Sequence, residues 1–318
     1  TKFWLDSPTL TDSDISDIRP KIFNVLLEIL GGDQVAAEYV LFTLLSKVQQ
    51  REDGVPLGIS CINLYCKNEE VSSEVLKGIE RFMKLVQSHT LTAQTDLDSL
   101  TTIELTPKKN YDTNRLSRGG LQFLNSTCAL FDETEMKEGK SEGEKLVFNM
   151  KGLASLIEEQ TVRYNFQYHE QNFDCSCPVI IVSTGRSIFK NTTAVPVEAF
   201  RDPNPDVLNS LEEDLLNQFR YFFNQVSRRG KKDIPDETSK HVQEKFVEAR
   251  QKETKDVKEK RKEQNEIGAK TLHSWLTYAQ IKTSSEGLPQ ITPEIIDSVI
   301  SLEEDRELRI QEILSGPK

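Results

Sequence analysis

Three short segments rich in apolar and β-branched residues constrain the fold of this chain most strongly. They lie within residues 55–66, 121–133 and 177–185 and read VPLGISCINLYC, LQFLNSTCALFDE and CPVIIVSTG. Such composition is typical of buried strands, and segments with helical spacing of apolar residues lie between them. Strands that alternate with helices indicate a parallel sheet, so the sequence predicts an α/β fold with a mainly parallel sheet up to about residue 200.

The expected helices and turns complete this pattern. Residues 12–30 predict a helix that ends at the tight turn Gly31-Gly32, and residues 36–48 predict a second, mostly buried helix. Residues 151–160 predict a short amphipathic helix and residues 161–173 a hairpin, whereas the charged stretch 135–145 predicts an exposed loop.

The composition changes after RDPNPD at 201–206, because the following residues are charged and show no strand pattern. Thr292-Pro293-Glu294 is a helix-start signal, with a capping oxygen, a proline in the first turn and an acid near the positive helix end. We therefore expect an N-terminal linker and helix start at 1–20, an α/β domain at 21–204 and a helical domain at 205–318 that contains the charged segment 250–266.

Composition and charge exclude several classes of protein. The chain has a net charge of -11 and no apolar run long enough for a membrane span, which disfavours sequence-independent binding to nucleic acid and predicts no membrane partner. Five scattered cysteines predict buried reduced thiols in the cytosol or nucleus, and neither they nor the four histidines have a metal-ligand spacing. The first residues lack a methionine and a secretory signal, from which we expect a fragment of a longer protein.

The order of short motifs is more specific. GDQVAAEY at 32–39 resembles the phosphate-binding Walker A loop of the minichromosome maintenance helicase ATPases. Gly32, Asp33 and Ala37 match, and Glu38 and Tyr39 replace the lysine and serine.

Further segments match the same helicases in order. CALFDET at 128–134 resembles their Walker B strand, with Asp132 and Glu133 in the metal-binding and water-activating positions. GLASLIEEQTV at 152–162 is similar to the helix before their pre-sensor hairpin, and VIIVSTG at 179–185 to their sensor strand, with Thr184 in place of asparagine. LLNQFRYFF at 215–223 resembles the arginine-finger segment, with Asn217-Gln218 in place of serine-arginine, and residues 273–302 look like the helical lid.

Residues 20–305 resemble still more closely the C-terminal half of the minichromosome maintenance complex-binding family, through LGGDQVAAEYVLFTLLS, PLG, YDTNRL, FDET, STGRS and FVEAR. This resemblance implies a degenerate AAA+-like P-loop domain followed by a helical lid. It also implies a nuclear protein that binds helicase subunits in DNA replication, chaperones or unloads them, and has lost ATPase activity.

The chemistry of the motif residues supports the loss of catalysis. A Walker A lysine attracts the phosphates, and one unit charge at about 4 Å contributes on the order of 4 kcal/mol at an effective dielectric of about 20. Glu38 reverses that charge, and Tyr39 is too large to act as the metal-binding hydroxyl. Without phosphates, Asp132 and Glu133 are expected to form a turn or a polar contact to a neighbouring loop, so we predict no cofactor and no metal.

Three regions are candidates for contact with a partner: the loop from Gly31 to Glu38, the hairpin 163–173 with Phe166 and Glu170, and residues 215–230 with Gln218 and Arg220. Two other functions stay open. One is a weak ATPase that uses Asp132 and Glu133, and the other is a DNA-binding replication factor in which Phe166 stacks on bases.

Overall fold

The structure, a computed structural model, describes residues 8–136, 143–185, 187–189, 193–257 and 268–315. The chain forms two compact units: one is Pro20–Asn224, and the other combines Thr1–Arg19 with Gln225–Lys318. The composition change near residue 205 thus falls inside the first unit. Most of α7 (Glu213–Val226) belongs to this unit because its aromatic side chains pack there. Phe219, Phe222 and Phe223 are buried, and Phe223 contacts Phe82 edge to face.

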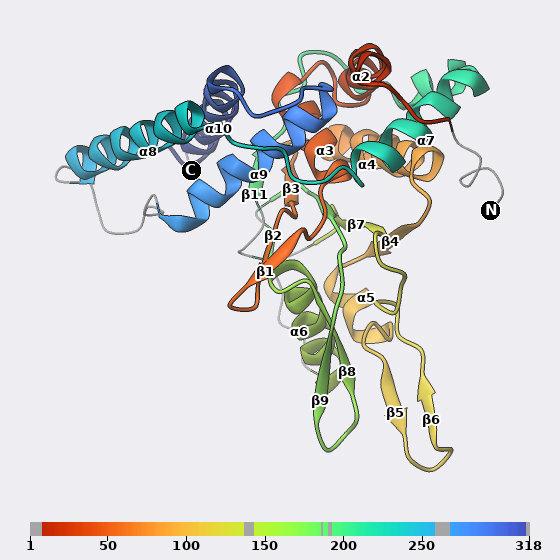
Figure 1. Cartoon of the computed structure of the whole chain (residues 1–318). Coiled ribbons are helices and arrows are strands. Elements are labelled where there is room, and N and C mark those ends of the chain that lie inside the picture. The colour runs from red at the N-terminus through yellow and green to blue at the C-terminus, as the bar shows by residue number, and fades with distance from the viewer. Residues whose placement is uncertain (1–7, 137–142, 186, 190–192, 258–267, 316–318) are drawn as a thin grey trace. The chain divides into compact units, whose positions relative to one another are not determined.

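The first unit is built on a five-stranded sheet in the order β11-β3-β10-β7-β4. All of its neighbouring strands run parallel, as the sequence predicts. Figure 1 labels β3, β4, β7 and β11 of this sheet. The strands are β3 (Cys61–Tyr65), β4 (Thr90–Gln94), β7 (Cys128–Glu133), β10 (Val179–Ser183) and β11 (Thr193–Pro196).

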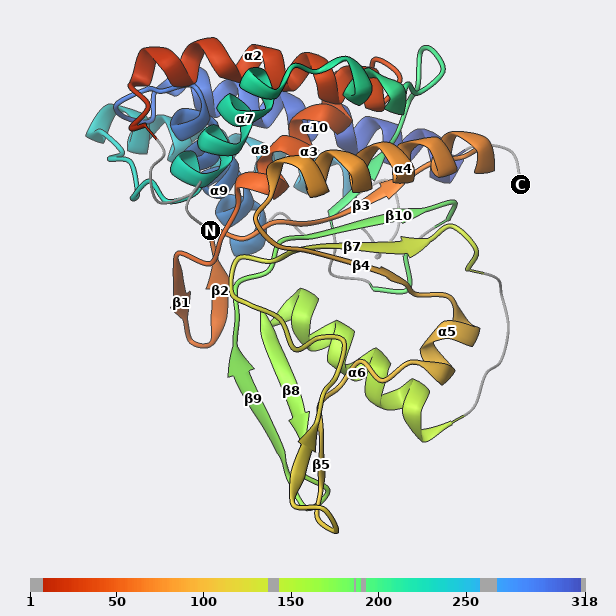
Figure 2. The same cartoon turned by 90° about the vertical axis from the view of Figure 1, so that its right-hand side faces the viewer.

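Helices cover both faces of this sheet (Figure 2). On one face lie α3 (Gln34–Leu45) and α4 (Glu69–Val86), and on the other α5 (Leu97–Thr102) and α6 (Glu144–Glu158). Because strand side chains alternate between faces, Phe131 and Ile181 join Leu153 and Leu156 of α6 in one apolar core. The remaining helical elements of the unit are the second part of α2 (Asp12–Ile29), the 3-10 helix η1 (Pro205–Ser210) and most of α7.

Two smaller sheets complete the unit. A four-stranded sheet in the order β6-β5-β8-β9 joins β5 (Lys108–Asn110), β6 (Arg115–Ser117), β8 (Thr161–Asn165) and β9 (Glu170–Asp174). The pair β8–β9 is the predicted hairpin, whereas β5 and β6 were not expected.

The segment 55–66 was expected to form one strand. The structure divides it between β3 and the two-stranded sheet of β1 (Gln50–Glu52) and β2 (Val55–Leu57). Gly58 makes the break, since its φ of +92° is accessible mainly to glycine and a Cβ there would meet Lys47 O at 2.9 Å.

The second unit is helical, with α8 (Asp236–Val257), α9 (Ala269–Ser285) and α10 (Pro293–Ser315). Helix α10 begins at Pro293, as the start signal predicts. The buried side chains of the second unit include Trp275 and Tyr278 of α9 and Ile296 and Val299 of α10. Part of the charged segment 250–266 continues α8 to Val257, and residues 258–266 lie outside the described part of the chain. Within the described residues, no helix is long and apolar enough to span a bilayer.

Candidate functional site

The carboxyl ends of the five parallel strands meet at one edge of the sheet, where ligands of open α/β sheets normally bind. Four segments with candidate chemistry reach this edge: the connection after β3, the acids at the end of β7, the residues after β10 and the residues after β11. This edge is therefore the candidate site, and its contacts decide what it can bind.

The predicted degenerate phosphate loop at 32–39 contacts the residues after β11 but does not lie between a strand and a helix. A P-loop follows a strand and opens a helix, but Gly31–Asp33 joins helix α2 to helix α3. Gly31 has a φ of +64°, and its carbonyl accepts the N–H groups of Phe200 (2.9 Å) and Arg201 (3.2 Å). The placement of the Walker A loop at these residues is therefore wrong.

Asp33 serves the junction between the two helices. Its Oδ1 accepts the Ala36 N–H at 3.1 Å and caps α3, while its Oδ2 accepts the Glu198 N–H at 2.7 Å. Gly31 is buried, as are Ala37, Tyr39 and Glu38, the last of which is 6% exposed, whereas Gly32 is half-buried. Gly31 and Glu38, predicted as partner contacts, therefore present little surface to a partner in this structure.

The first connection along the described chain that leads from a strand to a helix is Cys66–Asn68, between β3 and α4. It has three residues and no glycine, and the Asn68 side chain accepts the Glu70 N–H at 2.8 Å. Glu69 and Glu70 occupy the first turn of α4, where an acid is stabilised by about 0.3–1 kcal/mol by the helix dipole. They place negative charge where a P-loop helix receives a phosphate, and the connection Cys66–Asn68 contains no Lys-Ser or Lys-Thr pair.

Asp132 and Glu133 follow each other at the end of β7, so their side chains leave opposite faces of the strand. Asp132 Oδ1 accepts both the backbone N–H (2.9 Å) and the hydroxyl (2.7 Å) of Thr134, forming a local turn. Glu133 accepts the Ser187 hydroxyl at 3.0 Å. Asp132 thus forms the expected turn, and Glu133 forms the expected contact to a neighbouring loop. The two carboxylates accept hydrogen bonds from different residues of the chain.

Glu133 is 2% exposed, and burial raises its pKa from 4.5 to about 7. Hydrogen bonds from Ser187 and from the Ile188 backbone oppose this rise, and the charge of Asp132 adds to it. Beside it, the Ser183 hydroxyl lies 2.8 Å from Asn63 Oδ1. The edge thus holds a buried carboxyl whose pKa is about 7 and which accepts a hydrogen bond from the Ser187 hydroxyl.

The remaining helicase-like positions also make internal contacts. Thr184 follows β10, and its hydroxyl donates to Thr134 O at 3.4 Å. Arg220 of α7 donates to Leu85 O and to Asn217 Oδ1, each at 2.8 Å, and pairs with Glu213 at 2.6 Å. Of the candidate contacts on α7, Gln218 and Arg220 are half-buried.

The β8–β9 hairpin carries the other candidate contacts. The Phe166 ring stacks on His169 with centroids 5.1 Å apart, and its carbonyl accepts the Tyr111 hydroxyl at 3.0 Å. Glu170 pairs with Arg163 at 3.1 Å, and Tyr168 is 83% exposed. Aromatic side chains therefore lie together at this hairpin, and one of them, Tyr111, comes from the β5–β6 hairpin, which sequence patterns did not reveal.

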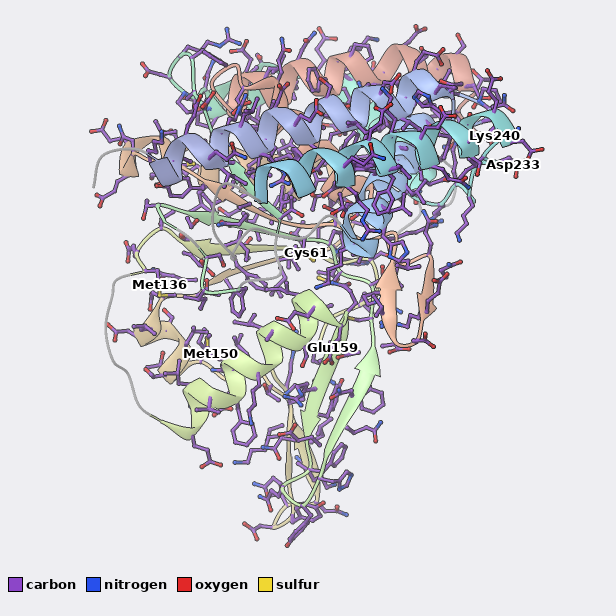
Figure 3. The ribbon with its side chains drawn as sticks, turned by 90° about the vertical axis from the view of Figure 1, so that its left-hand side faces the viewer. Cys61, Met136, Met150, Glu159, Asp233 and Lys240 are labelled. Atoms are coloured by element: carbon purple, nitrogen blue, oxygen red, sulfur yellow. The ribbon has the colours of Figure 1, made fainter. Side chains whose placement is uncertain are left out.

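The opposite, amino edge of the sheet carries most of the cysteines, and Figure 3 labels Cys61 at the start of β3 and Glu159 near the end of α6. Gln160 Nε2 lies 3.7 Å from the Cys61 sulfur and 3.0 Å from Cys177 O, and Arg51 donates to Glu159 O at 2.7 Å. All five cysteines have free thiols. No group of three or more metal-ligating side chains occurs among the residues that the structure describes.

The fold and the carboxyl ends of its strands define a class of protein: a parallel-sheet α/β protein. In it, the strand-to-helix connection Cys66–Asn68 and the acids Asp132 and Glu133 form hydrogen bonds with other groups of the same chain. The sequence assigns it to a family: residues 6–310 match the family described as "Mini-chromosome maintenance replisome factor", and the chain belongs to that family.

Proteins named "Mini-chromosome maintenance complex-binding protein" are similar to this chain. The one from Gallus gallus is 31% identical over 307 residues, which cover 94% of this chain and 46% of the relative. The one from Homo sapiens is 29% identical over 94% of this chain and 46% of its own length. The one from Dictyostelium discoideum is 28% identical, with coverages of 88% and 40%. The chain thus spans less than half the length of these relatives.

Proposed function

We propose that this chain is a non-catalytic binding partner of the minichromosome maintenance helicase complex. The observation that carries the proposal is the family match, which extends over residues 6–310 and so includes both compact units. The relatives are named for binding that complex, and the assignment of such binding to this chain rests on their similarity.

In this proposal the sheet unit is a degenerate AAA+-like domain and the helices that follow it are its lid. The order of β3, β7 and β10 supports this comparison, because in the helicases the phosphate loop follows one parallel strand and the acids and the sensor end two others. The connection Cys66–Asn68 supports the loss of ATP hydrolysis, since it lacks the glycines and the Lys-Ser or Lys-Thr pair that hold phosphates and Mg²⁺.

A domain of this shape without catalytic groups offers a helicase subunit a surface similar to that of a neighbouring subunit. It would occupy that face without hydrolysing ATP. In the nucleus it would chaperone unassembled subunits, or help to remove assembled rings from chromatin by competing for a subunit interface.

The test is size-exclusion chromatography of this chain with each purified helicase subunit, with and without Mg-ATP. Co-elution with at least one subunit, unchanged in a subunit variant that cannot bind ATP, supports a catalytically silent partner. Failure to bind any subunit while the intact relatives bind under the same conditions would refute the proposal for this region.

A weak ATPase is the second candidate, and the raised pKa of Glu133 favours it because proton-transferring carboxyls commonly show such shifts. This function requires saturable binding of Mg-ATP that Asp132→Ala abolishes. Isothermal titration calorimetry of the chain and of that variant separates it from the binding role.

A further inference from the structure

The outer strand β4 of the five-stranded sheet has an open edge. Cys128 N–H donates to His89 O, and Thr95 N–H donates to Asp132 O, so residues 89, 91, 93 and 95 direct their backbone groups toward β7. By alternation, Thr90, Thr92 and Gln94 direct theirs away from the sheet. Within the described residues these outward groups have no hydrogen-bonded partner, and the Thr92 and Gln94 side chains are exposed.

A groove begins where β4 begins, and Thr90 belongs to both. It has a volume of about 890 Å³ and is lined by Ser88, His89, Thr90, Leu91, Arg118, Gly120, Gln122, Phe123, Leu124, Thr127 and Tyr164. Its apolar part includes Leu124, which is 62% exposed. None of these described lining residues is acidic, whereas Arg118 and His89 carry or can carry positive charge.

The segment that leads into this groove is positively charged, whereas the chain as a whole is negatively charged. Residues 108–118 contain Lys108, Lys109, Arg115 and Arg118 against the single acid Asp112, in a protein whose net charge is -11. Lys109 is used locally, since it donates to the carbonyl and the side chain of Asn114. In the described part of the chain, Arg118 is exposed and lies within ion-pair distance of no carboxylate.

We propose that the edge of β4 and the groove at its start form a docking site for an extended acidic peptide of a partner protein. The peptide adds a strand to β4 through Thr90, Thr92 and Gln94, and an acidic side chain beside the paired segment binds Arg118. Backbone pairing of this kind supplies affinity, while the pocket beside the strand supplies selectivity. This site goes beyond the proposed function, because it does not require that the peptide come from the helicase.

The probe is a fluorescein-labelled short peptide in which glutamate alternates with valine, measured by fluorescence anisotropy against the whole chain. A peptide of the same pattern with lysine in place of glutamate is the charge control. We expect the acidic peptide to bind at least ten times more tightly than the basic one, and its affinity to fall as salt is added.

Two variants test the two parts of the site separately. Thr92→Pro removes an outward N–H that is not needed for pairing with β7, and Thr92→Ala is its control because it keeps that N–H. Arg118→Glu reverses the charge in the groove, and Arg115→Glu makes the same change on the same hairpin outside the groove lining. Circular dichroism establishes that each variant is folded.

The proposal predicts at least a tenfold loss of peptide affinity in Thr92→Pro and in Arg118→Glu, with the two controls within about twofold of the native chain. Equal losses in Arg115→Glu and Arg118→Glu would overturn it in favour of diffuse charge attraction. Absence of binding to the native chain would also overturn it. So would a native dimer, seen by light scattering, that Thr92→Pro converts to monomer, because a second copy would then occupy the edge.

Discussion

Replacing Glu133 by glutamine tests whether the carboxyl at the end of β7 is held in the way the structure indicates. Burial raises the pKa of this group from 4.5 to about 7, so the folded chain binds its proton more tightly than the unfolded chain. The contribution of Glu133 to the free energy of unfolding is then greatest below about pH 4.5 and falls as the pH rises through about 7. At about 1.36 kcal/mol for each pKa unit, the total loss is on the order of 3 kcal/mol.

Glutamine keeps the size of the side chain and an oxygen that accepts the Ser187 hydroxyl, but it does not ionise. We therefore expect Glu133→Gln to become more stable than the native chain with rising pH, by about 2 kcal/mol more at pH ~8.5 than at pH ~5.5. Ser187→Ala should increase the pH dependence of the native carboxyl, because the hydroxyl that lowers the pKa of Glu133 is gone.

Urea unfolding followed by far-ultraviolet circular dichroism at several pH values measures these differences. Hydrogen exchange of the amides in β7 and β10 assigns the transition to the sheet unit, which matters because the chain has two compact units. If Glu133→Gln and the native chain lose stability in parallel between about pH 5.5 and 8.5, the buried-carboxyl reasoning is wrong.

Three further substitutions test the structure by urea unfolding. Gly31→Ala should lower the free energy of unfolding by more than about 2 kcal/mol, because its φ is +64° and the new Cβ would clash with the backbone oxygen of Arg201. Gly54→Ala is the control: its φ is +85° and nothing lies within 4 Å of the new Cβ, so it should lose only about 1 kcal/mol. Asp33→Ala should cost about 2 kcal/mol, since it removes a helix cap and a second buried hydrogen bond. Arg51→Met should cost about 1–3 kcal/mol through the lost bonds to two carbonyls at the end of α6, and an unchanged stability would contradict that role.

The local sequence pattern was sufficient to predict those helices and strands that have a strong composition or capping signal of their own. The strand at Val179–Ser183 is fully buried and is β-branched at every position before Ser183, and the helix at Pro293 begins at a strong capping signal. Strand β4 reads TLTAQ, β11 contains a proline, and β5 reads KKN. These three owe their conformation to pairing with distant segments, which a local pattern does not contain.

The site was predicted less well than the fold. Gly32 and Asp33 carry the letters of a phosphate loop, but a P-loop is defined by the strand before it, and the residues before Gly31 are helical. The connection after β3 went unnoticed because it lacks glycine, although Asn68 followed by two acids is a helix-start signal. The hydrogen bond that Glu133 accepts comes from Ser187 in the loop after β10, which lies more than fifty residues away in sequence.

The pairing of β3 with β11 has a consequence for how the chain is made. Ile62 pairs with Thr193, 131 residues later, and Cys61 pairs with Val179 on the other side. At roughly 5–20 residues per second, a ribosome needs about 7 to 26 s to synthesise the interval between Ile62 and Thr193. Both edges of β3 lack their partners until β10 is made, and the edge that pairs with β11 lacks its partner for the whole interval. The nascent chain therefore passes through a prolonged state in which an apolar strand of the sheet has unpaired backbone groups.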